Sequence, residues 1–276
     1  MNIDYTNIFS LEGKVALVTG GAGHLGGPMA RGLAAHGAHV IVVGRRQDQL
    51  EAFTTIPNPI PEEAEEREPN YWARYYTGDV TDEKRFGEIM DALIEEYGQI
   101  DILINNAFNE ERKPFEEITK QEWNDGVNNI LTHQFTCMQR AIKEMLTQPA
   151  GGSIINISSI YGSVAVNPKT YTEVASSTPF YAAAKAGVTQ LSKYAAALYA
   201  SKGIRVNCIS PGPFPKPPPQ GDKGRPGYIV DLANQIPMKR VGKPHELVGA
   251  ALFLASNASS FVTGQNIVVD GGFTAW

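Results

Sequence analysis

The sequence lacks the features of a secreted, membrane-embedded or nucleic-acid-binding protein. It has two cysteines in 276 residues, Cys137 and Cys208, and both lie in apolar contexts that favour buried thiols in a reducing compartment over a disulfide framework. No apolar run approaches the length of a membrane span, and the start MNIDYTNIFSLEGK has no apolar core of a secretion signal. The net charge of −5 disfavours nucleic acid and anionic membranes as partners. We therefore expect a cytoplasmic protein with a small-molecule substrate.

Short β-branched apolar runs alternate with helix-like segments along the chain. The strand candidates are residues 15–19, 39–43, 73–77, 102–105, 153–157, 205–208 and 266–269. Between them, stretches such as 84–97 repeat apolar residues at three- and four-residue steps, which is the period of an amphipathic helix. Strands and helices that alternate through mostly short connections predict parallel pairing in a doubly wound α/β sheet. We expect residues 1–276 to form one such domain.

Three segments interrupt this alternation. Residues 57–70 are proline-rich and acidic, which is typical of a solvated surface insertion. A polar loop near 163–180 precedes a helix-like stretch at 180–200, and a segment near 213–230 is too rich in proline and glycine for a long helix. The last segment follows a strand, at the edge where open α/β sheets bind ligands, and we expect it to form a substrate lid.

A glycine-rich turn, TGGAGHLG at 19–26, directly follows the first strand candidate. Its glycines fit two registers: Gly21, Gly23 and Gly26 give G-x-G-x-x-G, whereas Gly20, Gly23 and Gly26 follow Thr19 as T-G-x-x-G-x-x-G. Either spacing at the start of a helix suits a dinucleotide, because unpaired N–H groups there attract a pyrophosphate and a Cβ would hold it away. The alternative is a tight strand-to-helix turn without a ligand.

The second strand candidate ends in Gly44, Arg45 and Arg46, with no carboxylate before Asp48. A carboxylate at this point accepts hydrogen bonds from the adenosine 2′-hydroxyl of NAD, whereas arginine pairs with the 2′-phosphate of NADP. The pattern favours NADP over NAD, with NAD possible. The alternative is a solvated helix start in which the arginines bind nothing.

Tyr181 and Lys185 stand four residues apart in a helix-forming stretch, which places both side chains on one face. A phenol with an ordinary pKa of about 10 transfers protons poorly at neutral pH, and a nearby ammonium lowers that pKa. Ser159 follows the strand candidate at 153–157 and so falls at a carboxyl edge, where its hydroxyl can hold a substrate oxygen. Taken alone, a Tyr-x-x-x-Lys pair also occurs by chance as a packed aromatic beside a solvated amine, but here it follows the Ser159 strand. We therefore expect Ser159, Tyr181 and Lys185 to be catalytic.

These motifs together resemble the short-chain dehydrogenase/reductase (SDR) family from about residue 11 onward. The matching stretches are TGGAGHLG, GDVTD (78–82), NNAF (105–108), GGSIINISSIYG (151–162), YAAAKAG (181–187), IRVNCISPG (204–212) and VTGQNIVVDGG (262–272). The resemblance implies a single Rossmann-type domain with a seven-stranded parallel sheet and helices on both faces. It also implies an NAD(P)-dependent enzyme acting on CH–OH donors, as a homotetramer or dimer. It implies a cofactor site made of Gly20, Gly23, His24, Leu25, Gly26, Arg45, Arg46, Asp79, Val80, Asn105, Ala107, Tyr181, Lys185, Pro211 and Gly212.

Three positions depart from the family's pattern. His24 replaces a glycine of the family's common turn, and Lys216 stands where a threonine often bonds the carboxamide. The family's helix asparagine, which supports a water chain to the lysine, aligns with Ile130. Either the helix is shifted so that Asn129 serves, or the proton relay differs.

The polar loop and the basic residues Lys216, Lys223 and Arg225 favour a polyol, sugar or sugar acid as substrate. A solvated loop whose lysines keep it soluble is nevertheless the preferred explanation of the basic residues themselves. Alternatives are a 3-oxoacyl-carrier or other ketone reductase, or a non-catalytic NAD(P)-binding protein. A nucleotide-sugar epimerase is disfavoured, because four residues after Gly272 leave no room for a C-terminal substrate domain. The five histidines are scattered, and we expect no metal.

Overall fold

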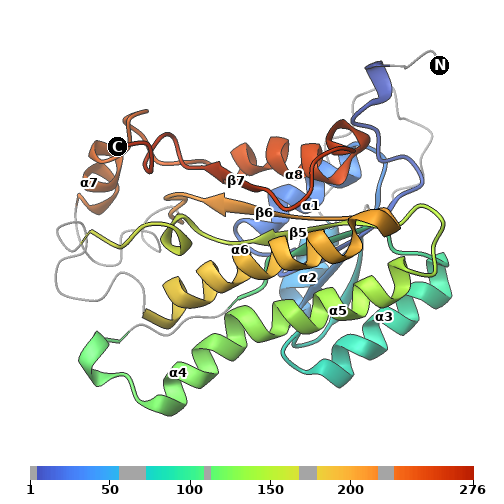
Figure 1. The fold of residues 1–276 in the computed structure, drawn as a ribbon, viewed down its shortest axis with the longest axis horizontal. Helices are drawn as coiled ribbons and strands as arrows, with labels where there is room; N and C mark the ends of the chain where they lie inside the picture. The colour runs from blue at the N-terminus through green and yellow to red at the C-terminus, as the bar shows by residue number, and fades with distance from the viewer. Residues whose placement is uncertain (1–4, 56–72, 109–112, 168–178, 217–226) are drawn as a thin grey trace.

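The computed structural model describes residues 5–55, 73–108, 113–167, 179–216 and 227–276 (Figure 1). The predicted insertion at 57–70 lies outside these residues, as do the central parts of the predicted loop near 163–180 and lid near 213–230.

One parallel sheet forms the centre of the molecule and confirms the predicted fold class. Its seven strands are β1 (Val15–Thr19), β2 (His39–Gly44), β3 (Ala73–Thr77), β4 (Ile102–Asn105), β5 (Gly152–Ile157), β6 (Ile204–Pro211) and β7 (Asn266–Val269). They lie in the order β3-β2-β1-β4-β5-β6-β7. The strand order reverses between β1 and β4, and ligands bind in the crevice at the carboxyl ends of strands at such a switch point. The predicted strands are all present, but β6 continues to Pro211 because its last residues pair with β7.

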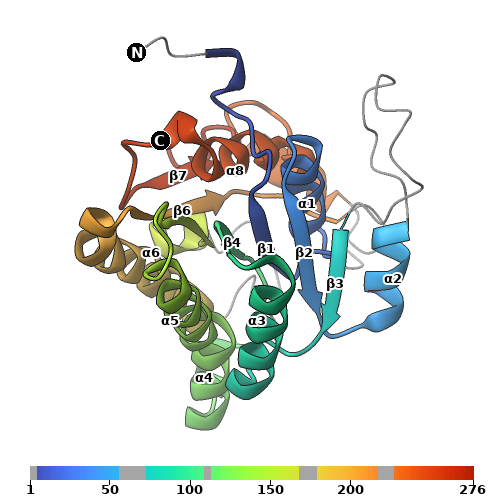
Figure 2. The same ribbon diagram turned by 90° about the vertical axis from the view of Figure 1, so that its right-hand side faces the viewer.

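Two layers of helices cover the sheet (Figure 2). The first layer contains α1 (Gly26–Ala35), α2 (Gln47–Thr55) and α8 (Val248–Ala255), and the second contains α3 (Glu83–Tyr97), α5 (His133–Met145) and α6 (Pro179–Tyr199). Successive side chains of β1 serve the two layers in turn: Ala16 and Val18 pack with the first, Val15 and Leu17 with the second. Both faces are buried, which explains why these strands read as continuous apolar runs.

The helical stretch from Lys120 to Met145 is divided by a wide turn. Helix α4 (Lys120–Val127) starts at a capping box formed by Thr119 and Glu122. It passes through a π-helical turn, Asn128–Thr132, into α5, and the His133 N–H donates to the Asn128 carbonyl five residues back. Such turns insert one residue into a helix and often occur at functional sites. Helix α7 (Tyr228–Asn234) follows the predicted lid at the carboxyl edge of the sheet. No described helix is long and apolar enough to cross a membrane.

Candidate active site

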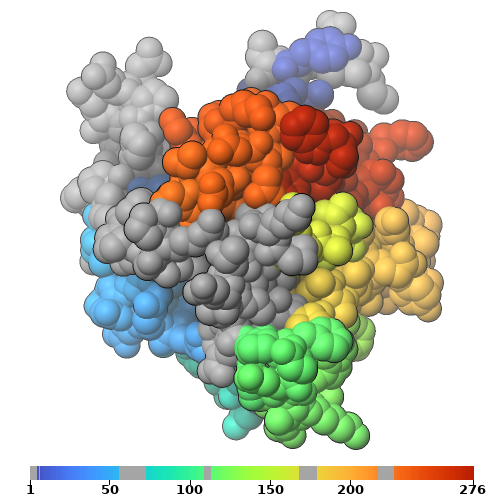
Figure 3. All heavy atoms as spheres, turned by 90° about the vertical axis from the view of Figure 1, so that its left-hand side faces the viewer, coloured from blue at the N-terminus to red at the C-terminus, as the bar shows by residue number. Residues whose placement is uncertain are grey.

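A cavity of about 810 Å³ lies at the carboxyl edge of the sheet, beyond the ends of β1 to β4. Figure 3 faces this edge, with α7 in orange on one side and α4 in green on the other. The lining comes from the turns after these strands, from α5 and from the segment after β6. It comprises Gly20, Ala22, Gly23, His24, Leu25, Val43, Gly44, Arg45, Arg46, Gln49, Leu50, Gly78, Asp79, Val80, Thr81, Asn106, Ala107, Phe108, Asn129, His133, Phe214 and Lys216.

The glycine turn after β1 adopts the T-G-x-x-G-x-x-G register. Gly20 has a φ of +62°, a conformation that favours glycine. The Gly23 N–H donates to the Gly20 carbonyl at 2.9 Å, and a Cβ on Gly26 would overlap that same carbonyl oxygen. Position 24 has no positive φ, so histidine fits where the common family turn has glycine. Gly21 is needed for another reason, since its Cβ would meet Val42 of β2 at 2.5 Å.

His24 ties this turn to the segment after β6. Its Nε2 donates to the Phe214 carbonyl at 3.1 Å, and Phe214 and Lys216 both line the cavity. The substitution that departs from the family's pattern therefore connects the pyrophosphate turn with the start of the predicted lid.

Charged groups meet at the end of the cavity next to β2. Arg45 and Arg46 line it, and Arg45 Nη1 lies 3.8 Å from Asp79 Oδ2. Partial burial acts to raise the pKa of Asp79, but hydrogen bonds from the Thr81 N–H at 3.0 Å and hydroxyl at 2.8 Å, with the charge of Arg45, lower it below its ordinary value. Asp79 is therefore a carboxylate at neutral pH.

Lys185 is buried, with a side chain and backbone that are 1% exposed. Its Nζ donates to the Ile157 carbonyl at the end of β5 at 2.6 Å. The same nitrogen lies 5.3 Å from the ring centre of Phe108 and 5.7 Å from that of Tyr181, and the two rings are 5.8 Å apart. A buried ammonium is costly unless it is paired, and here a carbonyl and two aromatic faces surround it. Phe108 thus connects the Tyr181–Lys185 pair with the cavity.

The two serines at the end of β5 point to different partners. The Ser158 hydroxyl bonds the Lys185 carbonyl at 2.9 Å and Thr189 at 2.9 Å, which fastens α6 to β5. Ser159 accepts the Tyr161 N–H at 3.2 Å and begins a short turn. Gly162 ends that turn, and its Cβ would lie 2.9 Å from the Lys185 backbone. The turn that starts at Ser159 therefore packs directly on the part of α6 that carries Lys185.

The structure gathers most, but not all, of the predicted cofactor residues around the cavity. Gly26, Asn105, Tyr181, Lys185, Pro211 and Gly212 are predicted residues outside its lining. Asn105 is fully buried, and its Nδ2 donates to Asn156 Oδ1 at 2.8 Å, whereas the neighbouring Asn106 lines the cavity. Pro211 and Gly212 lie at the carboxyl end of β6, and the Gly212 N–H pairs with Val269.

Sequence reasoning did not name Asn106, Phe108 or His133 as site residues. Asn106 and Phe108 stand inside the NNAF motif, where only the first and third positions were assigned, so the motif itself was the available signal. His133 lies on a helix, and nothing in its local sequence separates a histidine that faces a cavity from one on a polar helix surface. Among the described residues, no three His, Cys, Asp or Glu side chains cluster as a metal site requires.

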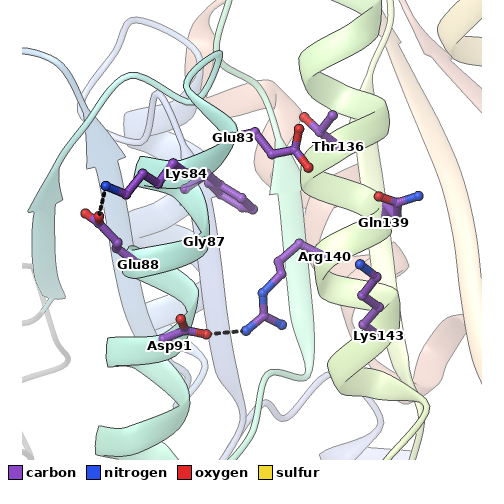
Figure 4. A pocket seen from close by; sticks show the side chains of 10 residues that line it. Glu83, Lys84, Gly87, Glu88, Asp91, Thr136, Gln139, Arg140 and Lys143 are labelled. Atoms are coloured by element: carbon purple, nitrogen blue, oxygen red, sulfur yellow. Dashed lines mark hydrogen bonds and ion pairs between the residues drawn. The ribbon is translucent and has the colours of Figure 1, made fainter.

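A second hollow, of about 610 Å³, lies between α3 and α5 (Figure 4). Arg140 of α5 reaches across it to Asp91 of α3 at 2.6 Å, and Lys84 pairs with Glu88 at 4.0 Å. These ion pairs balance the charge within the hollow, and we interpret the hollow as part of the packing between α3 and α5.

The first cavity fits a nicotinamide dinucleotide. At the start of α1 the backbone turns so tightly that a Cβ on Gly23 or Gly26 would meet the Gly20 carbonyl, and N–H groups at a helix start suit a pyrophosphate. Two guanidinium groups lie at one end and the buried Lys185 lies beyond Phe108 at the other. The residues that would hold the dinucleotide therefore span from the end of β2 to the end of β5.

Comparisons with known proteins agree with this architecture. Residues 21–274 match the family model described as enoyl-(acyl carrier protein) reductase. The chain is 34% identical to cis-4-hydroxycyclohexanecarboxylate dehydrogenase of Sinomonas cyclohexanicum, over 95% of this chain and 97% of that protein. It is also 34% identical to gluconate 5-dehydrogenase of Gluconobacter oxydans, over 99% of both. The structure of a short-chain dehydrogenase from Leptospira borgpetersenii with bound NAD+ is similar with a TM-score of 0.80, at 31% identity over 99% of this chain and 97% of that one.

Proposed function

The chain belongs to the short-chain dehydrogenase/reductase family, an NAD(P)-dependent family of oxidoreductases, and on this basis we propose the following reaction and coenzyme for it. It interconverts a secondary alcohol and a carbonyl on a small polar substrate such as a polyol, sugar or sugar acid, with NADP(H) preferred. The observation that carries this proposal is the buried Lys185 ammonium 5.7 Å from the Tyr181 ring at the end of β5.

Tyr181 is the proposed acid and base. Its phenol takes the hydroxyl proton when the alcohol is oxidised and returns it when the carbonyl is reduced, and the bound nicotinamide accepts or supplies the hydride. The Lys185 charge favours the phenolate over the phenol because opposite charges lie close together in a region of little water. Ser159 orients the substrate oxygen. Catalysis then depends mainly on positioning.

Arg45 and Arg46 support the preference for NADP(H). Both line the cavity at the end of β2, where a 2′-phosphate would meet guanidinium groups instead of a carboxylate. The ion pair between Arg45 and Asp79, at 3.8 Å, is exposed, so a phosphate can compete for the arginine at little cost. The Leptospira relative was solved with NAD+, which makes NAD the second coenzyme to compare.

The names of the two curated relatives favour a substrate that carries a carboxylate. One is named for gluconate and the other for a hydroxycyclohexanecarboxylate. In this chain, Lys216 lines the cavity on the segment after β6, where an ammonium can attract a substrate carboxylate.

We further infer a homo-oligomer, a tetramer or dimer, located in the cytoplasm. Large apolar side chains are exposed on α5 and α6: Phe135 is 43%, Tyr194 64% and Leu198 52% exposed. Contact between copies would cover these faces. Both cysteines are buried free thiols, which suits a reducing compartment.

Two assays test the proposal. In the oxidative direction, turnover of NADP+ and NAD+ is measured with a panel of polyols, sugar acids, hydroxycyclohexane carboxylates and other secondary alcohols. In the reductive direction, turnover of NADPH and NADH is measured with the matching ketones and a 3-oxoacyl thioester. We expect a hydroxy acid or polyol to be oxidised, with the higher kcat/KM for NADP+. Equal or better rates with NAD+ would refute the coenzyme preference. Tight NADPH binding without turnover of any compound would favour a non-catalytic protein.

A further inference from the structure

Four buried polar atoms cluster where α5 passes the ends of β4 and β5. Within the described part of the chain, Asn105 Oδ1, Gln134 Oε1 and both ring nitrogens of His133 have no hydrogen-bond partner. These residues are 0%, 1% and 2% exposed. A buried polar atom left without a partner costs about 1–3 kcal/mol, so such atoms usually hold a water or a ligand.

Gln134 lies against the groups that hold the catalytic lysine. Its Nε2 donates to the Ile157 carbonyl at 3.5 Å, and this carbonyl also accepts the Lys185 Nζ at 2.6 Å. The Gln134 carbonyl accepts Asn105 Nδ2 at 3.4 Å. The side-chain amide of Gln134 and the Lys185 ammonium therefore share one acceptor, and Oε1 remains for another donor.

His133 belongs to this cluster and also lines the cavity. Burial and the positive charge of Lys185 lower its pKa to about 4, while the Asn128 and Ala107 carbonyls and the Asp79 carboxylate act in the opposite direction. The ring is therefore neutral at neutral pH. A neutral imidazole has one donor and one acceptor nitrogen, so it can bond a water on either side.

The residue that aligns with the family's helix asparagine supplies no polar group in this protein. Ile130, which aligns with the family's asparagine, is fully buried against Phe180 and Ala184 and offers no polar group. Gln134 follows it after four residues, across the π-helical turn. Asn129 lines the cavity beside His133, whereas Gln134, from the next turn of the helix, bonds the Ile157 carbonyl.

We propose that Gln134 is a positioning residue for Lys185, and that with His133 it holds a buried water that links the Lys185 ammonium to the cavity. Water fits this place because it needs two to four polar partners and the cluster offers both donors and acceptors. The inference rests on the proposed function of Lys185. It assigns to Gln134 the part that the family gives to its helix asparagine.

The primary test is Gln134→Leu, which removes the amide with little change of volume. Turnover is measured with the best substrate of the panel, and coenzyme binding by NADPH fluorescence. We expect kcat to fall by about 10²-fold, as misplacement of a catalytic group does, with KM and the NADPH Kd within about threefold of wild type. The double variant Ile130→Asn with Gln134→Leu should recover part of the loss, because it returns an amide to the family's position.

Two further variants distinguish a role of Gln134 from a role of Asn129 and from a general effect of substitutions on α5. Gln139→Leu changes an exposed glutamine on the outer side of the same helix (Figure 4) and should leave kcat unchanged. Asn129→Leu, at a residue that lines the cavity, tests the competing assignment. A large loss in Asn129→Leu with none in Gln134→Leu would overturn the proposal and assign the role to Asn129.

A crystal structure supplies a readout that needs no substrate. We expect an ordered water within hydrogen-bond distance of both Gln134 Oε1 and Lys185 Nζ, and its absence would overturn the proposal even if Gln134→Leu does not fold. Tyr181→Phe is the reference that isolates this inference. If that variant is inactive while Gln134→Leu is fully active, only the role of Gln134 fails; if Tyr181→Phe is fully active, the proposed function fails.

Discussion

The two ends of the site are built by different parts of the chain. The end proposed to hold the pyrophosphate is made of backbone in one short segment, residues 19–26, where Gly20 has a positive φ and Gly26 lies close to the Gly20 carbonyl. The end around Lys185 is made of side chains from separate elements: Ser159 follows β5, Lys185 lies on α6 and Phe108 follows β4. One end depends on the absence of Cβ atoms, the other on the burial of a charge.

This difference shows how the two ends tolerate change. A backbone cradle accepts a side chain wherever the backbone does not need a positive φ, which is why histidine is tolerated at position 24. A buried ammonium cannot lose a partner so easily, because removing one leaves a charge or a carbonyl unsatisfied. Substitutions should therefore affect binding at the first end and chemistry at the second.

The largest expected effect tests the second end. Tyr181→Phe keeps the ring that packs on Phe108 but removes the hydroxyl, so it should lower kcat by about 10²- to 10⁴-fold, the usual contribution of a general acid or base. NADPH fluorescence titration should give an unchanged Kd. A variant that loses coenzyme binding and turnover together would show that the two ends are not separable.

A smaller effect is expected at the backbone end. Gly26→Ala places a Cβ on the Gly20 carbonyl and 2.6 Å from Asn106 Nδ2, so the turn must open and the NADPH Kd should rise at least about tenfold, or 1.4 kcal/mol. Gly87→Ala on α3 is the matched control, because its Cβ meets nothing within 4 Å. An unchanged Kd in Gly26→Ala would mean that the cradle does not hold the coenzyme.

The third effect is on stability and leaves catalysis aside; it concerns the boundary between the two ends, where His133 is buried. Its pKa falls from 6.5 in the unfolded chain to about 4, so the unfolded state binds more protons between these values and stability falls as the pH drops from 6.5 toward 4. Urea unfolding should give about 2 kcal/mol less stability from this group at pH 5 than at pH 7.5. His133→Gln should lack that part of the decrease; the same slope in both proteins would contradict the burial of a neutral ring.

Much of the fold could be predicted because the signals are local. The strands Val15–Thr19, Ala73–Thr77 and Ile102–Asn105 have the bounds read from their apolar runs, and the glycine turn precedes α1 as expected. β6 was predicted too short, because its last residues Ile209, Ser210 and Pro211 become strand only by pairing with β7, far along the chain.

The site was predicted less completely than the fold. Tyr181, Lys185 and Ser159 carry a spacing that chemistry explains, so the sequence alone could propose them as catalytic residues. Gln134 and His133 have no such spacing, and their importance arises from burial beside Ile157 and Lys185, which only the packed structure shows. For Asn105 the motif indicated a cofactor contact, but a motif does not specify whether a side chain faces the cavity or the core.

The claim that most depends on this arrangement is that Lys185 acidifies the Tyr181 phenol. The direct measurement is a spectrophotometric titration of phenolate absorbance in wild type and Tyr181→Phe, since the difference isolates one of the 11 tyrosines. We predict that the difference shows a phenol whose pKa lies below the ordinary value of about 10, and that Lys185→Met in the wild-type background raises it. A Tyr181 that titrates with the other tyrosines, and that ignores the loss of Lys185, would contradict the account.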